Sequence, residues 1–136
     1  MQKIRWGIMG TGRIAGIFCN MLKELEQAEI YAAASRSIEK AAEFGSKYHA
    51  AKSYGSYEEL VQDDQVDIIY VATPIACHYE NVKLCLNAGK HVLCEKALTQ
   101  SVEQAKELYA LSKEKQVFLM EAMWTKCQPV FRKVME

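Results

Sequence analysis

The sequence has no excess of either charge, no apolar run long enough to span a membrane and no apolar stretch behind its first residues, Met-Gln-Lys-Ile-Arg. The 17 basic and 17 acidic residues give a formal net charge of zero. Neutral composition without charged blocks argues against a nucleic-acid partner, and the other two absences argue against a membrane protein and a signal peptide. We therefore expect a globular protein of the cytoplasm that binds neither nucleic acid nor membrane.

The five cysteines contain no C-x-x-C pair and are odd in number: Cys19, Cys77, Cys85, Cys94 and Cys127. A disulfide framework or a zinc site would need paired or regularly spaced cysteines. Several of these cysteines lie within or beside apolar runs, where cysteine usually serves as a small core residue. The pattern therefore predicts reduced thiols and no metal site.

Apolar runs and helical patterns alternate along the whole chain. The runs predict strands at 4–9, 30–34, 51–53, 66–72, 92–94 and 117–120. The intervening segments carry helix signals: Ser37, Ser56 and Ser101 as N-caps, Pro74 as a first helical residue, and Gly89 as a left-handed C-terminal glycine. Strand–helix alternation is typical of an α/β fold with a doubly wound parallel sheet. We place this domain at residues 1–121 and interpret 122–136 as the start of a connection to a further domain.

The loop after the first strand, Gly10-Thr11-Gly12-Arg13-Ile14-Ala15, has the form G-x-G-x-x-A. The apolar residues after it recur at helical spacing, as on one face of an amphipathic helix: Ile14, Ile17, Phe18, Met21, Leu22 and Leu25. In such loops the first glycine permits a tight turn, the second admits a pyrophosphate, and the third small residue allows close helix–strand packing. The loop therefore predicts dinucleotide binding; the alternative is a purely structural turn.

The end of the second predicted strand indicates which dinucleotide is bound. NAD sites place an acidic residue there to bind the ribose 2′-hydroxyl. This chain has Ser35 and Arg36 instead. A hydroxyl and a guanidinium suit a 2′-phosphate, so NADP is predicted, with NAD still possible. Alternatively, Arg36 is a solvated loop residue.

Ligands of open α/β sheets bind beyond the carboxyl ends of the strands. The residues that follow the predicted strands, and that we expect beside the cofactor, are Gly10 to Gly12, Ser35-Arg36, Ala72-Thr73-Pro74, Glu95-Lys96, and Glu121 followed by Trp124. A lysine at this edge could hold a substrate hydroxyl and move its proton if partial burial lowered its pKa to about 7–8. Glu95 would then orient Lys96. A solvated ion pair between these two residues explains the spacing equally well.

Three segments carry a resemblance to a known family: "GIMGTGRIAGIF", "YVATPIACHYENVKLCLNAGKHVLCEKALT" and "MEAMWTKCQPVF". Together they resemble the N-terminal Rossmann domain of the Gfo/Idh/MocA oxidoreductases, especially NADP-dependent dihydrodiol and D-xylose dehydrogenases. The resemblance implies that Lys96 contacts substrate and nicotinamide ribose. It also implies that Thr73-Pro74 packs near the nicotinamide, that His78 lies near the active site, and that the substrate is a sugar, polyol or cyclic diol. His78 could instead be a solvated helix residue.

Two departures from that family matter. The proline that follows the family's lysine is Ala97 here, which gives Lys96 more backbone freedom. The family's second α/β domain, which supplies most of the substrate pocket and the surface for homo-oligomers, is absent from these residues. The main hypothesis is thus the cofactor domain of a dehydrogenase or reductase. The alternative is a non-catalytic dinucleotide-binding module with a regulatory or redox-sensing role.

Overall fold

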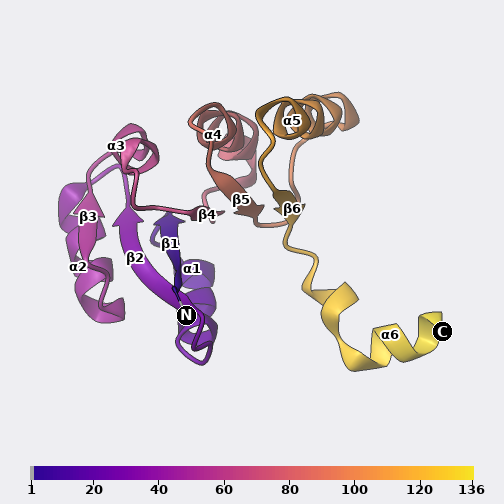
Figure 1. The fold of residues 1–136 in the computed structure, drawn as a ribbon, viewed down its shortest axis with the longest axis horizontal. Helices are drawn as coiled ribbons and strands as arrows, with labels where there is room; N and C mark the ends of the chain where they lie inside the picture. The colour runs from indigo at the N-terminus through magenta and orange to yellow at the C-terminus, as the bar shows by residue number, and fades with distance from the viewer. Residues whose placement is uncertain (1) are drawn as a thin grey trace.

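A computed structural model describes residues 2–136 as a sheet flanked by helices (Figure 1). The strands are β1 (Ile4–Met9), β2 (Ala28–Ala34), β3 (Lys52–Tyr54), β4 (Ile68–Val71), β5 (His91–Cys94) and β6 (Leu119–Glu121). The α-helices are α1 (Arg13–Leu22), α2 (Ile38–Tyr48), α3 (Tyr57–Gln62), α4 (Ile75–Asn87), α5 (Val102–Lys115) and α6 (Pro129–Met135), with a 3₁₀ turn, η1, at Trp124–Cys127. None of the described helices combines the length and the apolar character needed to cross a membrane.

All strand pairs are parallel, and the sheet order is β3-β2-β1-β4-β5-β6. Helices α1 and α2 cover one face, while α3, α4 and α5 cover the other (Figure 1). The predicted doubly wound parallel sheet is therefore confirmed. The strand order reverses direction between β1 and β4, where the two halves of such a fold leave a crevice for ligands.

The strands end in register across the sheet. Their last paired residues form one continuous row: Ala34, Met9, Val71, Cys94 and Glu121. The residues that follow each member of this row therefore emerge at one edge. Because of this shared edge, the residues that follow the strands lie together, as the sequence predicted.

Helix α1 packs against the sheet through its smallest side chains. Ala15, Gly16 and Cys19 are buried, and Gly16 also faces α2, where the Tyr48 hydroxyl oxygen would lie only 2.4 Å from a Cβ atom at this position. The apolar residues Ile14, Ile17, Met21 and Leu25 are instead 43–64% exposed. Most of the apolar face expected for this helix therefore faces solvent. Small residues occupy the inner side instead, because the helix approaches the sheet closely there.

Most predicted helix boundaries are confirmed. The hydroxyl groups of Ser37, Ser56 and Ser101 each accept a hydrogen bond from the backbone N–H three residues later. Gly89 adopts the left-handed conformation after α4, with φ of +74°. Pro74 was placed one position too far into the helix: it is the N-cap of α4, with ψ of 147°, and Ile75 is the first helical residue.

The strand boundaries differ slightly from the predicted ones. Strand β4 begins at Ile68 rather than Val66, because Val66 donates its N–H to the Asp63 carbonyl oxygen in a turn. Strand β6 begins at Leu119 rather than Val117, whose N–H caps the end of α5 by donating to Ser112. In both cases a turn uses the hydrogen-bonding groups that the sheet would have required.

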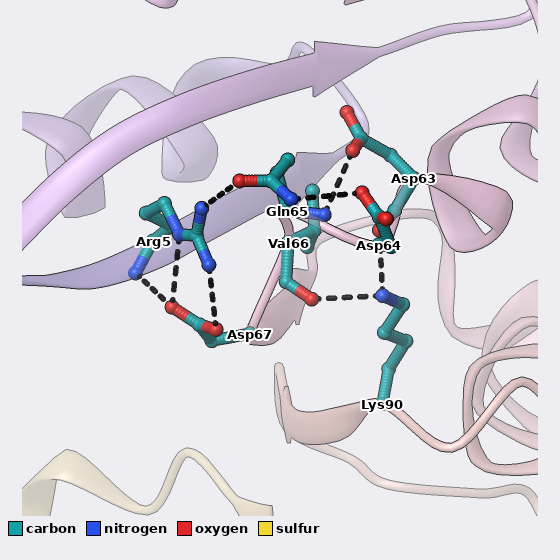
Figure 2. A network of polar contacts seen from close by, with 7 residues as sticks. All are labelled: Arg5, Asp63, Asp64, Gln65, Val66, Asp67 and Lys90. Carbon is teal, nitrogen blue, oxygen red and sulfur yellow. Dashed lines mark hydrogen bonds and ion pairs between the residues drawn. The ribbon is translucent and has the colours of Figure 1, made fainter.

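A polar network closes the amino ends of β1 and β4 (Figure 2). The Asp67 carboxylate accepts from the backbone N–H of Arg5 at 2.7 Å and from its guanidinium. The Lys90 ammonium is buried and donates to the carbonyl oxygens of Asp63 at 2.6 Å and Val66 at 2.8 Å. The charged groups of Arg5, Asp67 and Lys90 are therefore bound within the chain itself.

The segment after β6 leaves the sheet (Figure 1). Residues 124–136 are all exposed, including Trp124 (63%) and Val134 (78%). Part of this segment is helical: α6 has Pro129 in its first turn. The proposed division of the chain after residue 121 stays a prediction.

Candidate functional site

The glycine loop lies where the sheet changes direction. Gly10 has φ of +98°, and a Cβ atom there would lie 2.8 Å from the Ala72 carbonyl oxygen. Only glycine fits this turn without strain. Gly12 differs, because a Cβ atom there would meet no atom within 4 Å. The structure therefore places the two glycines as the motif predicts: the first makes the turn, and the second faces open space.

The start of α1 has free hydrogen-bond donors. Gly12 is its N-cap and no side chain caps the helix, so the N–H groups of the first turn keep their bonding capacity. The positive end of the helix dipole adds a favourable potential for an anion. Ala15, the third small residue of the motif, is fully buried and brings helix and sheet together. This geometry fits a pyrophosphate group.

A groove between α1 and α2 opens beside the glycine loop. Thr11, Gly12 and Arg13 line it together with two cationic side chains of α2, Lys40 and Lys47. Its one acidic lining residue is Glu43. Lys40 was not predicted as a site residue, although its place in the first turn of α2, close behind Arg36 in sequence, was an available signal. The excess of positive charge suits a phosphorylated ligand.

The two residues predicted to select the cofactor differ in exposure. Arg36 is exposed, and residues 2–136 provide no ion-pair partner for it. Ser35 is 8% exposed, its N–H donates to Tyr54, and its hydroxyl oxygen accepts a long bond of 3.5 Å from the Ser37 N–H. Arg36 is therefore the available group at this strand end, while Ser35 shapes the turn.

His78 is buried and links two loops. Its ring nitrogen Nε2 lies 2.7 Å from the Thr73 carbonyl oxygen, and Nδ1 lies 2.7 Å from the Ala97 carbonyl oxygen. The ring is 1% exposed, so the alternative of a solvated helix histidine is wrong. The Thr73 hydroxyl oxygen accepts a bond from Asn81. His78 therefore lies behind the site edge and joins the loop after β4 to the loop after β5.

Glu95 and Lys96 do not form an ion pair with each other, which was one of the two alternatives for these residues. One Glu95 carboxylate oxygen accepts from the Tyr70 hydroxyl at 2.6 Å, and the other accepts from the backbone N–H of Lys96 at 3.2 Å. Burial, and then the hydrogen bond to Glu95, raise the pKa of Tyr70, which keeps this hydroxyl a donor. The Lys96 side chain is exposed and has no ion-pair partner among the described residues. Glu95 thus fixes the Lys96 backbone, while the ammonium stays available at the edge.

The partial burial required for a proton-transferring Lys96 is not provided by residues 2–136, since this side chain is exposed. The peptide bond between Lys96 and Ala97 is cis.

Trp124, which was predicted to contact the cofactor, lies in the exposed η1 turn. The structure brings the residues after β1, β2, β4 and β5 to one edge, whereas Trp124 belongs to the segment that leaves the sheet.

Residues 4–123 match the model of a protein family described as "Oxidoreductase family, NAD-binding Rossmann fold", the Gfo/Idh/MocA family. The chain belongs to this family. The resemblance inferred from the three sequence segments is therefore confirmed.

Two curated relatives illustrate the similarity. A D-xylose 1-dehydrogenase (NADP(+)) from Hypocrea jecorina is 44% identical over 98% of this chain and 37% of its own length. A trans-1,2-dihydrobenzene-1,2-diol dehydrogenase from Homo sapiens is 41% identical over 93% of this chain and 38% of its own length. The chain therefore spans about two fifths of the length of these enzymes.

A solved structure shows the same fold. A 3-ketoreductase from Actinomadura kijaniata, crystallised with NADP, superposes with a TM-score of 0.93 at 34% identity, over 98% of this chain and 42% of that one. These relatives are named as dehydrogenases or a reductase, which favours the main hypothesis over a regulatory or redox-sensing module.

Proposed function

We propose that this chain binds NADP(H) as the cofactor-binding part of an oxidoreductase that acts on a sugar, a polyol or a cyclic diol. One observation carries the proposal: the glycine loop at the switch point, with open space at Gly12 and uncapped N–H groups at the start of α1. The names of the D-xylose dehydrogenase, the dihydrodiol dehydrogenase and the 3-ketoreductase support the substrate class.

The choice of NADP rests on charge. Arg36 is exposed at the end of β2, and Arg13 and Lys40 lie on the adjacent groove. A guanidinium can donate two parallel hydrogen bonds to a phosphate, which it cannot do to a ribose hydroxyl. No acidic side chain follows β2 to hold a 2′-hydroxyl. NAD is therefore the weaker ligand.

The nicotinamide of NADP(H), when bound, exchanges a hydride with a carbon atom of the substrate. Lys96 would contact the nicotinamide ribose, hold the substrate hydroxyl and move its proton, while Glu95 fixes the Lys96 backbone and the Thr73 loop lines the nicotinamide side. The homo-oligomer and the remaining substrate contacts belong to the proposed whole enzyme. We also propose a cytoplasmic location, supported by five cysteines that are all free.

The cofactor preference tests the proposal directly. Replacing Arg36 by alanine should remove most of the preference for NADPH over NADH, a loss of about 1–3 kcal/mol typical of charge-assisted hydrogen bonds. Isothermal calorimetry on the unaltered chain, on Arg36→Ala and on the control Arg132→Ala, which changes an exposed arginine of α6, would measure it. Equal affinity of the unaltered chain for NADPH and NADH would contradict the proposal.

A further inference from the structure

The backbone on the far side of Lys96 is held by a side chain from the neighbouring strand. The Leu98 N–H donates to a Glu121 carboxylate oxygen at 2.7 Å. Leu98 is 5% exposed, so its N–H has little access to water and depends on this acceptor. On the other side of the same segment, the Ala97 carbonyl oxygen lies 2.7 Å from His78. The segment is thus held from two opposite directions.

Glu121 is itself firmly placed. It pairs with Cys94 as the last residue of β6, and the next N–H, that of Ala122, donates to the Cys94 carbonyl oxygen at 2.7 Å. The Glu121 carbonyl oxygen accepts from Met123 at 2.8 Å. The ladder between β5 and β6 therefore continues to the point where the carboxylate reaches across to Leu98. A hydrogen bond from an N–H to a carboxylate is stronger than one to a neutral acceptor.

Lys96 lies two residues before this anchor. The Lys96 side chain has no ion-pair partner among the described residues, so its direction depends on the backbone of residues 95–98. Contacts at Glu95 and Ala97 fix that backbone from the β4 side. The Glu121 contact is the one that fixes it from the β6 side.

We infer that Glu121 is a positioning residue, which sets the direction of Lys96 by binding the Leu98 N–H. The inference rests on the proposed function, in which Lys96 contacts the nicotinamide half of NADP(H). Glu121 itself does not touch the reacting atoms. Its contribution should therefore appear only with ligands that carry the nicotinamide half.

Binding of two compounds distinguishes the nicotinamide half of the site from the adenosine half. NADPH contacts both halves, whereas adenosine 2′,5′-bisphosphate lacks the nicotinamide and its ribose. Glu121→Ala should weaken NADPH binding by about tenfold, which corresponds to about 1.4 kcal/mol, and leave adenosine 2′,5′-bisphosphate binding unchanged. Glu121→Gln keeps an acceptor oxygen and should restore NADPH binding. Glu114→Ala, at an exposed glutamate of α5, is the matched control and should bind both compounds normally.

Amide hydrogen exchange without ligand gives an independent measurement. The Leu98 amide should exchange at least about ten times faster in Glu121→Ala, while the amide of Ile69 in β4 keeps its rate and reports an intact fold. Glu121→Gln keeps a neutral acceptor and should therefore protect Leu98 nearly as well as the unaltered chain does.

Unchanged Leu98 exchange, equal weakening of both compounds, or a Glu121→Gln variant as impaired as Glu121→Ala would overturn the inference. Failure of the unaltered chain to bind either compound would instead overturn the proposed function. In that case the exchange rates would still decide whether Glu121 fixes the segment.

Discussion

The amino and carboxyl ends of the same parallel sheet both carry charged side chains but bind them differently. At the amino ends of β1 and β4, Arg5 donates to Asp67, and the Lys90 ammonium is buried against two carbonyl oxygens (Figure 2). At the carboxyl ends, Arg36 and Lys96 are exposed and have no ion-pair partner among residues 2–136. The first arrangement stabilises the fold, and the second leaves cations available to a ligand.

The glycines at the two ends should show the largest difference. Gly12→Val should lower NADPH affinity at least a hundredfold, about 2.7 kcal/mol, because its side chain would occupy the open space beside the N–H groups of α1. The free energy of unfolding should fall by no more than about 1 kcal/mol, since a Cβ atom there meets nothing and the main cost is that valine is a poorer N-cap than glycine.

Gly89 is the matched opposite of Gly12. Its φ of +74° strains any other residue, so Gly89→Ala should lower the free energy of unfolding by about 1 kcal/mol and leave NADPH affinity unchanged. Calorimetry and thermal unfolding of both variants would measure this. Normal NADPH binding by a folded Gly12→Val variant would show that the glycine loop is only a turn.

A second pair of variants compares the two lysines. Lys90→Met should reduce the free energy of unfolding by about 2–3 kcal/mol, because two carbonyl oxygens lose a charged donor. Lys96→Met should change the free energy of unfolding by less than about 0.5 kcal/mol, as expected of an exposed side chain, but weaken NADPH binding. Urea unfolding gives the first quantity and calorimetry the second. Equal loss of stability in both variants would remove the distinction between the two ends.

The sequence was sufficient for the fold because each element carries a local signal. Serine caps, a left-handed glycine and unbroken apolar runs specified the helices and strands within two residues at most boundaries. The glycine loop could be predicted because its spacing reflects backbone geometry. The motif correctly predicted that Ala15 packs closely, but the apolar period was wrong for most of the buried face of α1, because the period alone does not reveal which side approaches the sheet.

The contacts around Lys96 were harder to predict. Glu95 precedes Lys96 in the chain, which suggested an ion pair, yet its carboxylate accepts from Tyr70, 25 residues away. Likewise, His78 is buried between two carbonyl oxygens that come from separate loops. Such partners depend on strand register and on how loops pack, and no local pattern contains that information.

The smallest expected effect is the pH dependence of stability that arises from Asp67. Burial alone would raise the pKa of this carboxyl, but hydrogen bonds from the Arg5 backbone and guanidinium outweigh burial and lower it. A lowered pKa in the folded state stabilises the fold above the unfolded value of about 3.9, and the stabilisation is lost as the pH falls through the folded value.

Urea unfolding between about pH 5 and pH 2 should therefore show stability falling with pH, and Asp67→Asn should reduce the slope. The difference should be about 0.5–1 kcal/mol, because the Asp67 side chain is partly exposed and solvent screens its ion pair. Asp63, whose pKa is also lowered by hydrogen bonds that outweigh burial, accounts for part of the slope that remains. An unchanged slope in Asp67→Asn would mean that the Arg5 contact does not persist in solution. In that case the amino end of the sheet would rely on Lys90 and Asp63 alone for its bound charges.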